Sequence, residues 1–187
     1  MVSISMICDF FHPNVGGVEN HIYMLSANLI KRGHRVNFLR SMTKISHLKR
    51  PQVIVVTHSH PPDRVGVRWL LPALKVYYLP FPTIASSATL PNYFTFLPYF
   101  RTIILREVIQ LIHGHAGLSS LAHEAILHAH HMGVRTVFTD HSLFGFDDAA
   151  SILTNKLLEG ALRNVDAAIC VSHTGYTPLP IQLTSYS

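Results

Sequence analysis

The chain has 187 residues, 48% of them hydrophobic, which is enough for one domain with a buried core. Its formal net charge of +5 favours anionic partners such as phosphates, nucleotides or acidic lipid surfaces, but the basic residues do not cluster with aromatic ones as a nucleic-acid groove requires. Only 13% of the residues are charged, so part of the surface is expected to face a partner, a second domain or a membrane.

Neither a secretory signal nor a transmembrane helix is predicted. The N-terminus, MVSISMICDF, lacks a basic segment followed by a long apolar one, and no apolar stretch reaches the roughly 18 residues that a spanning helix needs. Cys8 and Cys170 each lie in a short apolar run and form no CxxC pair. We therefore expect two reduced, buried thiols rather than a disulfide framework or a zinc site.

Short apolar runs alternate with longer helical patterns along the chain. Strands are predicted at residues 2–8, 53–57, 74–79, 134–140 and 166–172, with a further one ending at residues 111–113. Helices are predicted at residues 16–33, 118–132 and 151–164. Strands that are apolar on both faces and alternate with helices favour a parallel sheet wrapped by helices. The predicted fold is α/β, a Rossmann-like doubly wound parallel sheet.

Three segments depart from this alternation. Residues 37–52 carry basic side chains without any acidic one where a short turn is expected, and residues 173–187 have no helical periodicity, which predicts disorder. Residues 76–100 contain no charged residue and are rich in aromatic ones, while their prolines exclude a continuous spanning helix. This last segment either lies at a lipid–water interface or packs on the sheet or on another domain, and both alternatives stay open.

Gly16 and Gly17 stand where the first predicted strand turns into the first predicted helix. Glycine lets backbone N–H groups approach an anion, and a helix N-terminus attracts negative charge. The spacing is neither GxGxxG nor GxxxxGK[ST], so no dinucleotide or P-loop fingerprint is present. From the spacing alone, a plain turn and a phosphate site are about equally supported.

The sequence HGHAG stands at the end of the fourth predicted strand. Ligands of open α/β sheets bind at the carboxyl ends of the strands, so His115 is well placed for a site, whereas His113 is expected to cap the strand. The i, i+2 histidine pair lacks a carboxylate at ligand spacing, and we therefore predict no metal site here. Four further histidines on the next predicted helix are expected to form a solvated face: His123, His128, His130 and His131.

The sequence TDHSLFGF, residues 139–146, ends the fifth predicted strand. Asp140, His141 and Ser142 cannot act as a catalytic triad, because adjacent residues do not point at one another. We interpret them as a polar loop that brings one imidazole, that of His141, into a cleft, with Gly145 allowing a turn. Three polar loops at the same sheet edge favour a ligand site over isolated loop histidines.

Four stretches closely resemble a known enzyme family. They are MICDFFHPNVGGVENHIYMLSANLIKRGHRV, LKVYYLPF, TVFTDHSLFGFDDAASILTNKLL and AICVSHT. The resemblance is to the catalytic subunits of phosphatidylinositol N-acetylglucosaminyltransferase (PIG-A-like), retaining GT-B glycosyltransferases that begin the synthesis of the glycosylphosphatidylinositol (GPI) anchor. It covers most of residues 3–173 apart from 37–52, and TDHSLFGF argues against a GT-B enzyme with another acceptor.

This resemblance implies an organisation and an activity. Residues 1–172 would be the N-terminal, acceptor-side Rossmann-like domain of a GT-B enzyme, with 37–52 as an atypical insert, 173–187 as a tail outside the family, and the C-terminal donor domain not included. The family transfers N-acetylglucosamine from UDP-N-acetylglucosamine to phosphatidylinositol without a metal or other cofactor. It works in a multi-subunit complex on the cytoplasmic face of the endoplasmic reticulum membrane.

The resemblance also implies roles for single residues. Gly16 and Gly17 would face the donor diphosphate, His141 would be the catalytic histidine near the transferred sugar, and His115 would line the acceptor side, while 76–100 would meet the lipid. Because a GT-B site needs both domains, the 187-residue chain alone is expected to be inactive. The alternative is a non-catalytic module that binds the transferase complex or the membrane surface.

Overall fold

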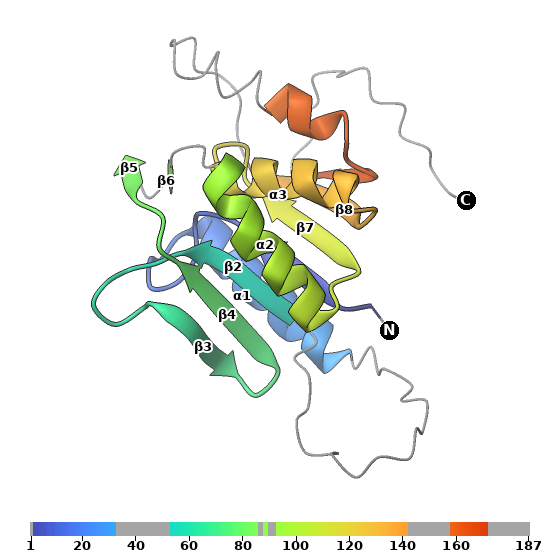
Figure 1. Ribbon diagram of the computed structural model, residues 1–187. Helices are drawn as coiled ribbons and strands as arrows, with labels where there is room; N and C mark the ends of the chain where they lie inside the picture. The colour runs from blue at the N-terminus through green and yellow to red at the C-terminus, as the bar shows by residue number, and fades with distance from the viewer. Residues whose placement is uncertain (1, 33–52, 86–87, 90–92, 142–157, 172–187) are drawn as a thin grey trace, which may run out of the picture.

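The structure is a computed structural model that describes residues 2–32, 53–85, 88–89, 93–141 and 158–171 (Figure 1). The expected insert at 37–52 and the expected tail at 173–187 therefore lie outside the described residues. Most of the helix predicted at 151–164 lies outside them as well, although residues 158–162 are helical.

The described strands form one seven-stranded sheet in the order β3-β4-β2-β1-β7-β8-β9, beside a short hairpin of β5 and β6. Every neighbouring pair in the sheet is parallel except β3 with β4. Without β3, the order is that of a doubly wound Rossmann sheet, which starts in the centre and grows outward on both sides. This confirms the predicted fold class. The strands are β1 (Ile4–Ile7), β2 (Val53–His58), β3 (Gly66–Leu71), β4 (Leu74–Leu79), β5 (Thr83–Ala85), β6 (Ala88–Thr89), β7 (Leu111–His115), β8 (Arg135–Asp140) and β9 (Ala167–Cys170).

Helices cover both faces of this sheet (Figure 1). They are α1 (Gly17–Lys31), α2 (Tyr93–Glu107) and α3 (Ser120–His131). On one face, Ile22 of α1 packs in a core that includes Val55 of β2. On the other face, Phe96 of α2 packs in a second core that includes Val56 of the same strand. Neighbouring residues of a strand point to opposite faces, so β2, which is buried along its whole length, contributes to both cores.

The edge strand β3 was not predicted from the sequence. It pairs antiparallel with β4 across a turn at residues 72–73. An edge strand has only one neighbour and needs no apolar residues on both faces, and Trp69 of β3 is 50% exposed. The sequence of β3 therefore lacks the continuous apolar run that identifies the central strands.

Three expectations about individual side chains are wrong. Cys170 is exposed because it lies on the edge strand β9, although Cys8 is buried as predicted. His123 is buried on the side of α3 that packs near Phe138, so it does not belong to a solvated face. His113 lies inside β7 rather than at its end, because this strand extends to residue 115.

The uncharged segment 76–100 has two environments. Val76 and the rest of β4 are buried in the sheet, and Phe96 and Phe100 are buried under α2. Phe94, by contrast, is 93% exposed, and Tyr99 is 44% exposed. Packing on the sheet therefore accounts for much of this segment, and it leaves the outer side of α2 without a described neighbour.

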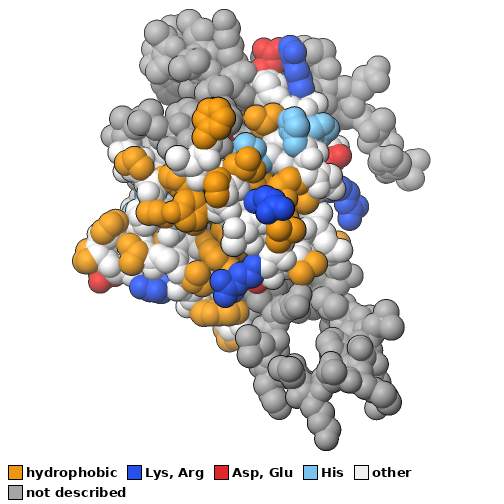
Figure 2. Space-filling model, in the orientation of Figure 1, with side chains coloured by type: hydrophobic (Ala, Val, Ile, Leu, Met, Phe, Trp, Pro, Cys, Tyr) orange, Lys and Arg blue, Asp and Glu red, His pale blue; other side chains and the backbone are white. Residues whose placement is uncertain are grey.

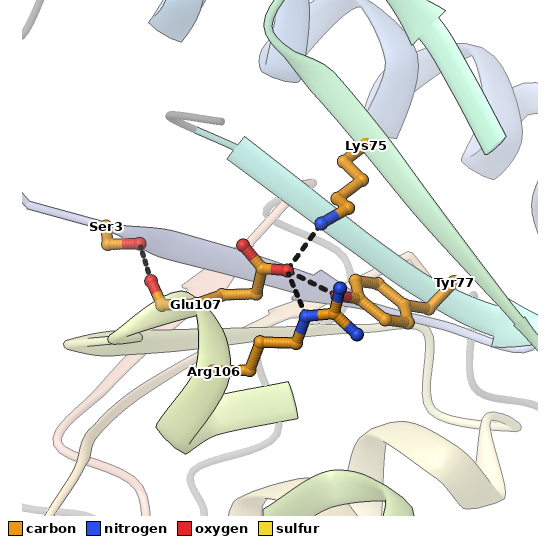
Figure 3. A network of polar contacts seen from close by, with 5 residues as sticks. All are labelled: Ser3, Lys75, Tyr77, Arg106 and Glu107. Atoms are coloured by element: carbon orange, nitrogen blue, oxygen red, sulfur yellow. Dashed lines mark hydrogen bonds and ion pairs between the residues drawn. The ribbon is translucent and has the colours of Figure 1, made fainter. Parts of the chain in front are cut away.

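A buried ion pair fixes the C-terminus of α2 to the amino edge of the sheet (Figure 3). Glu107 accepts a hydrogen bond from Lys75 Nζ at 2.6 Å and another from the Tyr77 hydroxyl. Arg106 Nε lies 3.9 Å from the same carboxylate oxygen, and the Ser3 hydroxyl donates to the backbone carbonyl of Glu107. Burial acts to raise the pKa of Glu107, but the hydrogen bonds from Lys75 and Tyr77 outweigh it and lower that pKa.

Candidate functional site

The polar residues singled out in the sequence meet at the opposite, carboxyl edge of the sheet. The strand β1 is central, with β2 on one side and β7 on the other, so the direction of winding reverses between β1 and β7. Open α/β sheets bind ligands outside the carboxyl ends of their strands at such a switch point. The end of β7, the residue after β8 and the first turns of α1 come together there.

Three histidines form a cluster at this edge: His21, His115 and His141. Nδ1 of His115 lies 3.3 Å from Nε2 of His141, and their rings stack with centroids 5.5 Å apart. The ring of His21, which reaches in from α1, is 4.7 Å from that of His141 and 5.8 Å from that of His115. His113 stacks on His115 at 4.1 Å, and its Nε2 lies 2.7 Å from the Thr139 hydroxyl.

The surroundings of His115 and of His141 disfavour the charged forms of these two imidazoles. Burial, together with the neighbouring histidines, lowers the pKa of His115 well below its usual value. Burial also lowers the pKa of His141. The nearby His21 lowers it further, whereas Asp140 acts to raise it. Nε2 of His115 is buried and meets no hydrogen-bond partner among the described residues. An unpaired buried nitrogen is costly, so it indicates a place for a polar group of a ligand.

The same cluster has the composition of a metal site. One ligand nitrogen from each of the three histidines lies within 4.8 Å of the other two. Neutral imidazoles bind zinc well, and three protein ligands are the usual set of a catalytic zinc. Tetrahedral zinc with bonds of about 2.0–2.1 Å holds its nitrogens about 3.4 Å apart, and Nδ1 of His115 and Nε2 of His141, 3.3 Å apart, already have about this separation. The prediction of no metal rested on the His113–His115 pair and did not include His21, which comes from a different element.

Asp9, directly after β1, connects the segments around the site. Its carboxylate accepts hydrogen bonds from the Thr89 hydroxyl in β6 and from the backbone N–H of Ser120 in α3, both at 2.9 Å. Its backbone N–H donates to the hydroxyl of Ser119, which also caps α3. Burial raises the pKa of Asp9 to about 6, although the hydrogen bonds from Thr89 and Ser120 act against this. Asp9 therefore positions β6 and the start of α3.

Gly16 and Gly17 lie at the N-terminus of α1, as predicted. Gly16 is the N-cap, and its φ of −163° is an extended conformation that any residue adopts. A Cβ on Gly16 would contact the carboxylate of Glu19, which folds back over the helix N-terminus, whereas a Cβ on Gly17 would meet open space. The first backbone N–H groups of α1 have no partner within the helix and suit an anion, provided that Glu19 moves aside.

The structure brings together most of the site residues expected from the sequence. Gly16 and Gly17 begin α1, His115 ends β7, Asp140 ends β8, and His141 follows it. Two further predicted residues of the same loop, Ser142 and Gly145, lie outside the described residues. Their expected place in the site stays a prediction.

Sequence reasoning missed several polar residues at the same edge. Asp9 follows the first strand directly, and that position was itself a signal. His21 carries no signal of its own, because only the fold brings α1 beside β7 and β8. His58 at the end of β2 and the nearby His60 form a further pair, with ring centroids 4.2 Å apart. Burial, followed by the effect of His58, lowers the pKa of His60.

The strand order and the helices on both faces define a Rossmann-like α/β domain with a polar carboxyl edge. A structure of sucrose-phosphate synthase from Thermosynechococcus elongatus is similar with a TM-score of 0.58 and 15% identity, over 90% of this chain and 42% of that chain. A second structure of the same synthase gives a TM-score of 0.54 and 16% identity, over 91% of this chain and 76% of that one. At such identities the similarity establishes the fold alone.

Sequence relatives are more specific. Residues 58–148 match the family described as PIGA (GPI anchor biosynthesis). The chain is 50% identical over 169 residues to the phosphatidylinositol N-acetylglucosaminyltransferase gpi3 subunit of Schizosaccharomyces pombe, covering 90% of this chain and 33% of that protein. It is 47% identical over 172 residues to the corresponding subunit of the same transferase in Homo sapiens, covering 92% and 32% respectively. The chain is therefore similar to the PIGA family over these residues, and it spans about a third of the length of the curated relatives it matches.

Proposed function

We propose that this chain forms the acceptor-side part of an N-acetylglucosaminyltransferase site that acts on phosphatidylinositol. The observation that carries the proposal is the buried imidazole of His115, whose Nε2 has no partner among the described residues and whose pKa burial lowers. A neutral imidazole hydrogen-bonds a hydroxyl group through either nitrogen, and it does not attract phosphate by charge. The histidine cluster therefore suits the hydroxyl groups of an inositol ring better than a phosphate.

In this proposal the two sides of the site have different tasks. Gly16 and Gly17 present backbone N–H groups to the diphosphate of UDP-N-acetylglucosamine. His141 is the catalytic residue beside the transferred sugar, and His115 binds the acceptor hydroxyls. Asp140 acts on His141 by favouring its charged form, and Ser142 and Gly145 belong to the same loop. Neither a metal nor another cofactor takes part, because the histidines serve as hydrogen-bond partners.

The proposal also includes a cellular setting. Because the relatives are named as subunits of a transferase, we propose that the chain assembles with other subunits on the cytoplasmic face of the endoplasmic reticulum membrane. In the described part of the chain, no helix is long and apolar enough to cross a bilayer. The competing proposal is a non-catalytic module that binds the same complex.

The decisive experiment places the chain in the context of its fission yeast relative. In cells that lack their own gpi3 subunit, the matched third of that protein is exchanged for this chain, and transfer of radiolabelled N-acetylglucosamine to phosphatidylinositol is measured. We expect an active chimera in which His115→Ala lowers transfer about tenfold, because a hydrogen bond to the acceptor is lost. His131→Ala, at an exposed position of α3, is the matched control and is expected to keep the full rate.

Two results would count against the proposal. An active chimera whose His115→Ala variant transfers at the unaltered rate would exclude the histidine cluster from the reaction. A chimera that assembles with the other subunits but transfers nothing would favour the non-catalytic module.

A further inference from the structure

We propose that the outer face of α2, together with the edge strand β3, docks on the surface of an anionic lipid bilayer. This lipid-docking face is defined by five exposed residues: Phe94, Arg101 and Leu105 of α2 and Val67 and Trp69 of β3. The proposal goes beyond the transfer reaction, since none of these residues belongs to the histidine cluster.

The outermost stripe of α2 is largely apolar. Phe94, Pro98, Arg101 and Leu105 follow one another at the spacing i, i+4, i+7 and i+11, which places them along one side of the helix. Phe94 is 93% exposed and Leu105 is 57% exposed. The opposite side of α2 packs on the sheet and is apolar as well. A helix that faces water on one side normally carries polar residues there, whereas this stripe of α2 is mostly apolar, with the exposed Thr95, Thr102 and Arg106 beside it.

The apolar surface continues from α2 onto β3. Val67 stands opposite Tyr77, and Trp69 stands opposite Lys75, in the antiparallel pair of β3 and β4. Directly opposite residues of such a pair point to the same face, and Tyr77 and Lys75 reach Glu107 of α2 on that face. Figure 2, viewed onto α2, shows hydrophobic side chains gathered over this face around Lys or Arg side chains.

The charges of α2 select an anionic lipid surface as the occupant. Both exposed charged residues of the helix are basic, Arg101 and Arg106, while its acid, Glu107, is buried against Lys75. A protein that covered the stripe would have to desolvate Arg101 in its middle, at a cost in free energy unless an acid met it. Lipid phosphates meet it with opposite charge, and exposed aromatic side chains such as Trp69 are typical of the lipid–water interface.

The orientation of α2 determines where the histidine cluster lies when the lipid-docking face is on a bilayer. The helix begins four residues after Thr89 of β6, which is bound to Asp9 at the carboxyl edge, and it ends at Glu107 on the amino edge. A helix of 15 residues is about 22 Å long and can lie flat on a bilayer. Docking along α2 would therefore hold the carboxyl edge near the membrane surface, within reach of an acceptor that is a lipid.

Vesicle flotation of the 187-residue chain tests the lipid-docking face. We expect the chain to bind phosphatidylcholine vesicles that contain phosphatidylserine, and not vesicles of phosphatidylcholine alone. Phe94→Ser combined with Leu105→Ser is expected to lower the partition coefficient at least about tenfold, because two apolar side chains no longer enter the lipid. Arg101→Gln is expected to lower it about fivefold at low salt and to have little effect at high salt.

Met24→Ser is the matched control, because Met24 is 51% exposed on α1, which covers the opposite face of the sheet. Circular dichroism establishes that each variant is folded. The proposal is wrong if the unaltered chain floats equally with both vesicles or with neither, or if the double variant floats as well as Met24→Ser. Self-association that the double variant abolishes, without vesicle binding, would assign the face to a second copy of the chain and also contradict it.

The outcome is separate from that of the transfer assay. Phosphatidylserine is not the proposed acceptor, and His115→Ala is expected to float like the unaltered chain. Loss of transfer with intact flotation, or the reverse, would therefore show which of the two proposals fails.

Discussion

The two edges of the sheet differ in how their buried polar groups are satisfied. At the amino edge, the carboxylate of Glu107 is paired with Lys75 and Tyr77. At the carboxyl edge, Nε2 of His115 is buried and has no partner among the described residues. Paired groups stabilise a fold, whereas unpaired ones reduce its stability and are available to a ligand. We therefore expect the amino edge to serve stability and the carboxyl edge to serve binding.

The largest effect on stability is expected at the amino edge. Glu107→Ala leaves Lys75, whose side chain is only 12% exposed, without its counter-charge, which is expected to lower the free energy of unfolding by about 3 kcal/mol. Urea denaturation of the purified chain measures this. Glu159→Ala is the control, because its pair with Arg163 is exposed and is expected to contribute less than about 0.5 kcal/mol. Equal losses in the two variants would contradict the special role of the amino edge.

Acid is expected to destabilise the chain through its buried histidines. Burial lowers the pKa of His123 from 6.5 to about 4, so between these pH values the unfolded chain binds a proton that the folded chain does not. The free energy of unfolding should therefore fall with falling pH in this window, by about 1.4 kcal/mol per pH unit for this one group. His113, whose pKa burial also lowers to about 4, acts with the same sign.

The histidine contribution is isolated by comparing two variants across that pH window. His123→Phe removes the buried imidazole and is expected to lessen the pH dependence of urea denaturation. His130→Phe, at an exposed position of the same helix, is expected to keep it. An unchanged pH dependence in His123→Phe would show that the folded chain protonates this site freely.

A smaller change of opposite sign is expected at the carboxyl edge. His115→Leu removes a buried Nε2 that has no partner among the described residues, together with the contact of Nδ1 with His141, and we expect the free energy of unfolding to rise by up to about 1 kcal/mol. The same variant of the chimera is expected to lose transfer. If His115→Leu destabilised the chain as much as Glu107→Ala does, the polar groups of both edges would contribute to stability in the same way.

A still smaller effect is expected at the N-terminus of α1. The carboxylate of Glu19 folds over Gly16, where it competes with an added anion. Glu19→Gln is therefore expected to strengthen the binding of inorganic diphosphate about threefold, as judged by the amide NMR shift of Gly17. Glu159→Gln, far from this helix in the sequence, is the control. Weaker binding to Glu19→Gln would exclude the competition.

No effect is expected from removing metal ions. If the three clustered histidines act through hydrogen bonds, a chelator leaves transfer by the chimera at its full rate. Loss of transfer in chelator, restored by added zinc, would instead assign the histidine cluster to a metal ion.

Much of the fold was predictable because its central strands are short, apolar and bounded by turns. The runs at 53–57, 74–79 and 134–140 read as strands since both of their faces are buried, and their alternation with helices sets the Rossmann order. The edge strands gave weaker signals. Residues 66–71 were missed, and Cys170 on β9 was expected to be buried, because an edge position depends on the neighbours that tertiary structure provides.

The site was predictable only where it coincides with the end of a strand. His115 and His141 were found because residues that follow parallel strands meet at one edge. His21 was missed because its distance from β7 and β8 depends on how α1 packs. The lowered pKa of His115 was missed because it depends on burial. Neither the packing of α1 nor the burial of His115 can be predicted from the local sequence.

The most direct test of the account is whether an inositol ring occupies the histidine cluster. The 187-residue chain, with isotope-labelled histidines, is titrated with soluble glycerophosphoinositol while nitrogen NMR records each imidazole. With glycerophosphoinositol, we expect saturable shifts of the ring nitrogens of His115 and His141 and no shift at the exposed His131. With glycerol 3-phosphate, which lacks the ring, we expect no shift at any of these three histidines. Shifts that are equal for both compounds, or absent from His115 while the ligand binds, would contradict it.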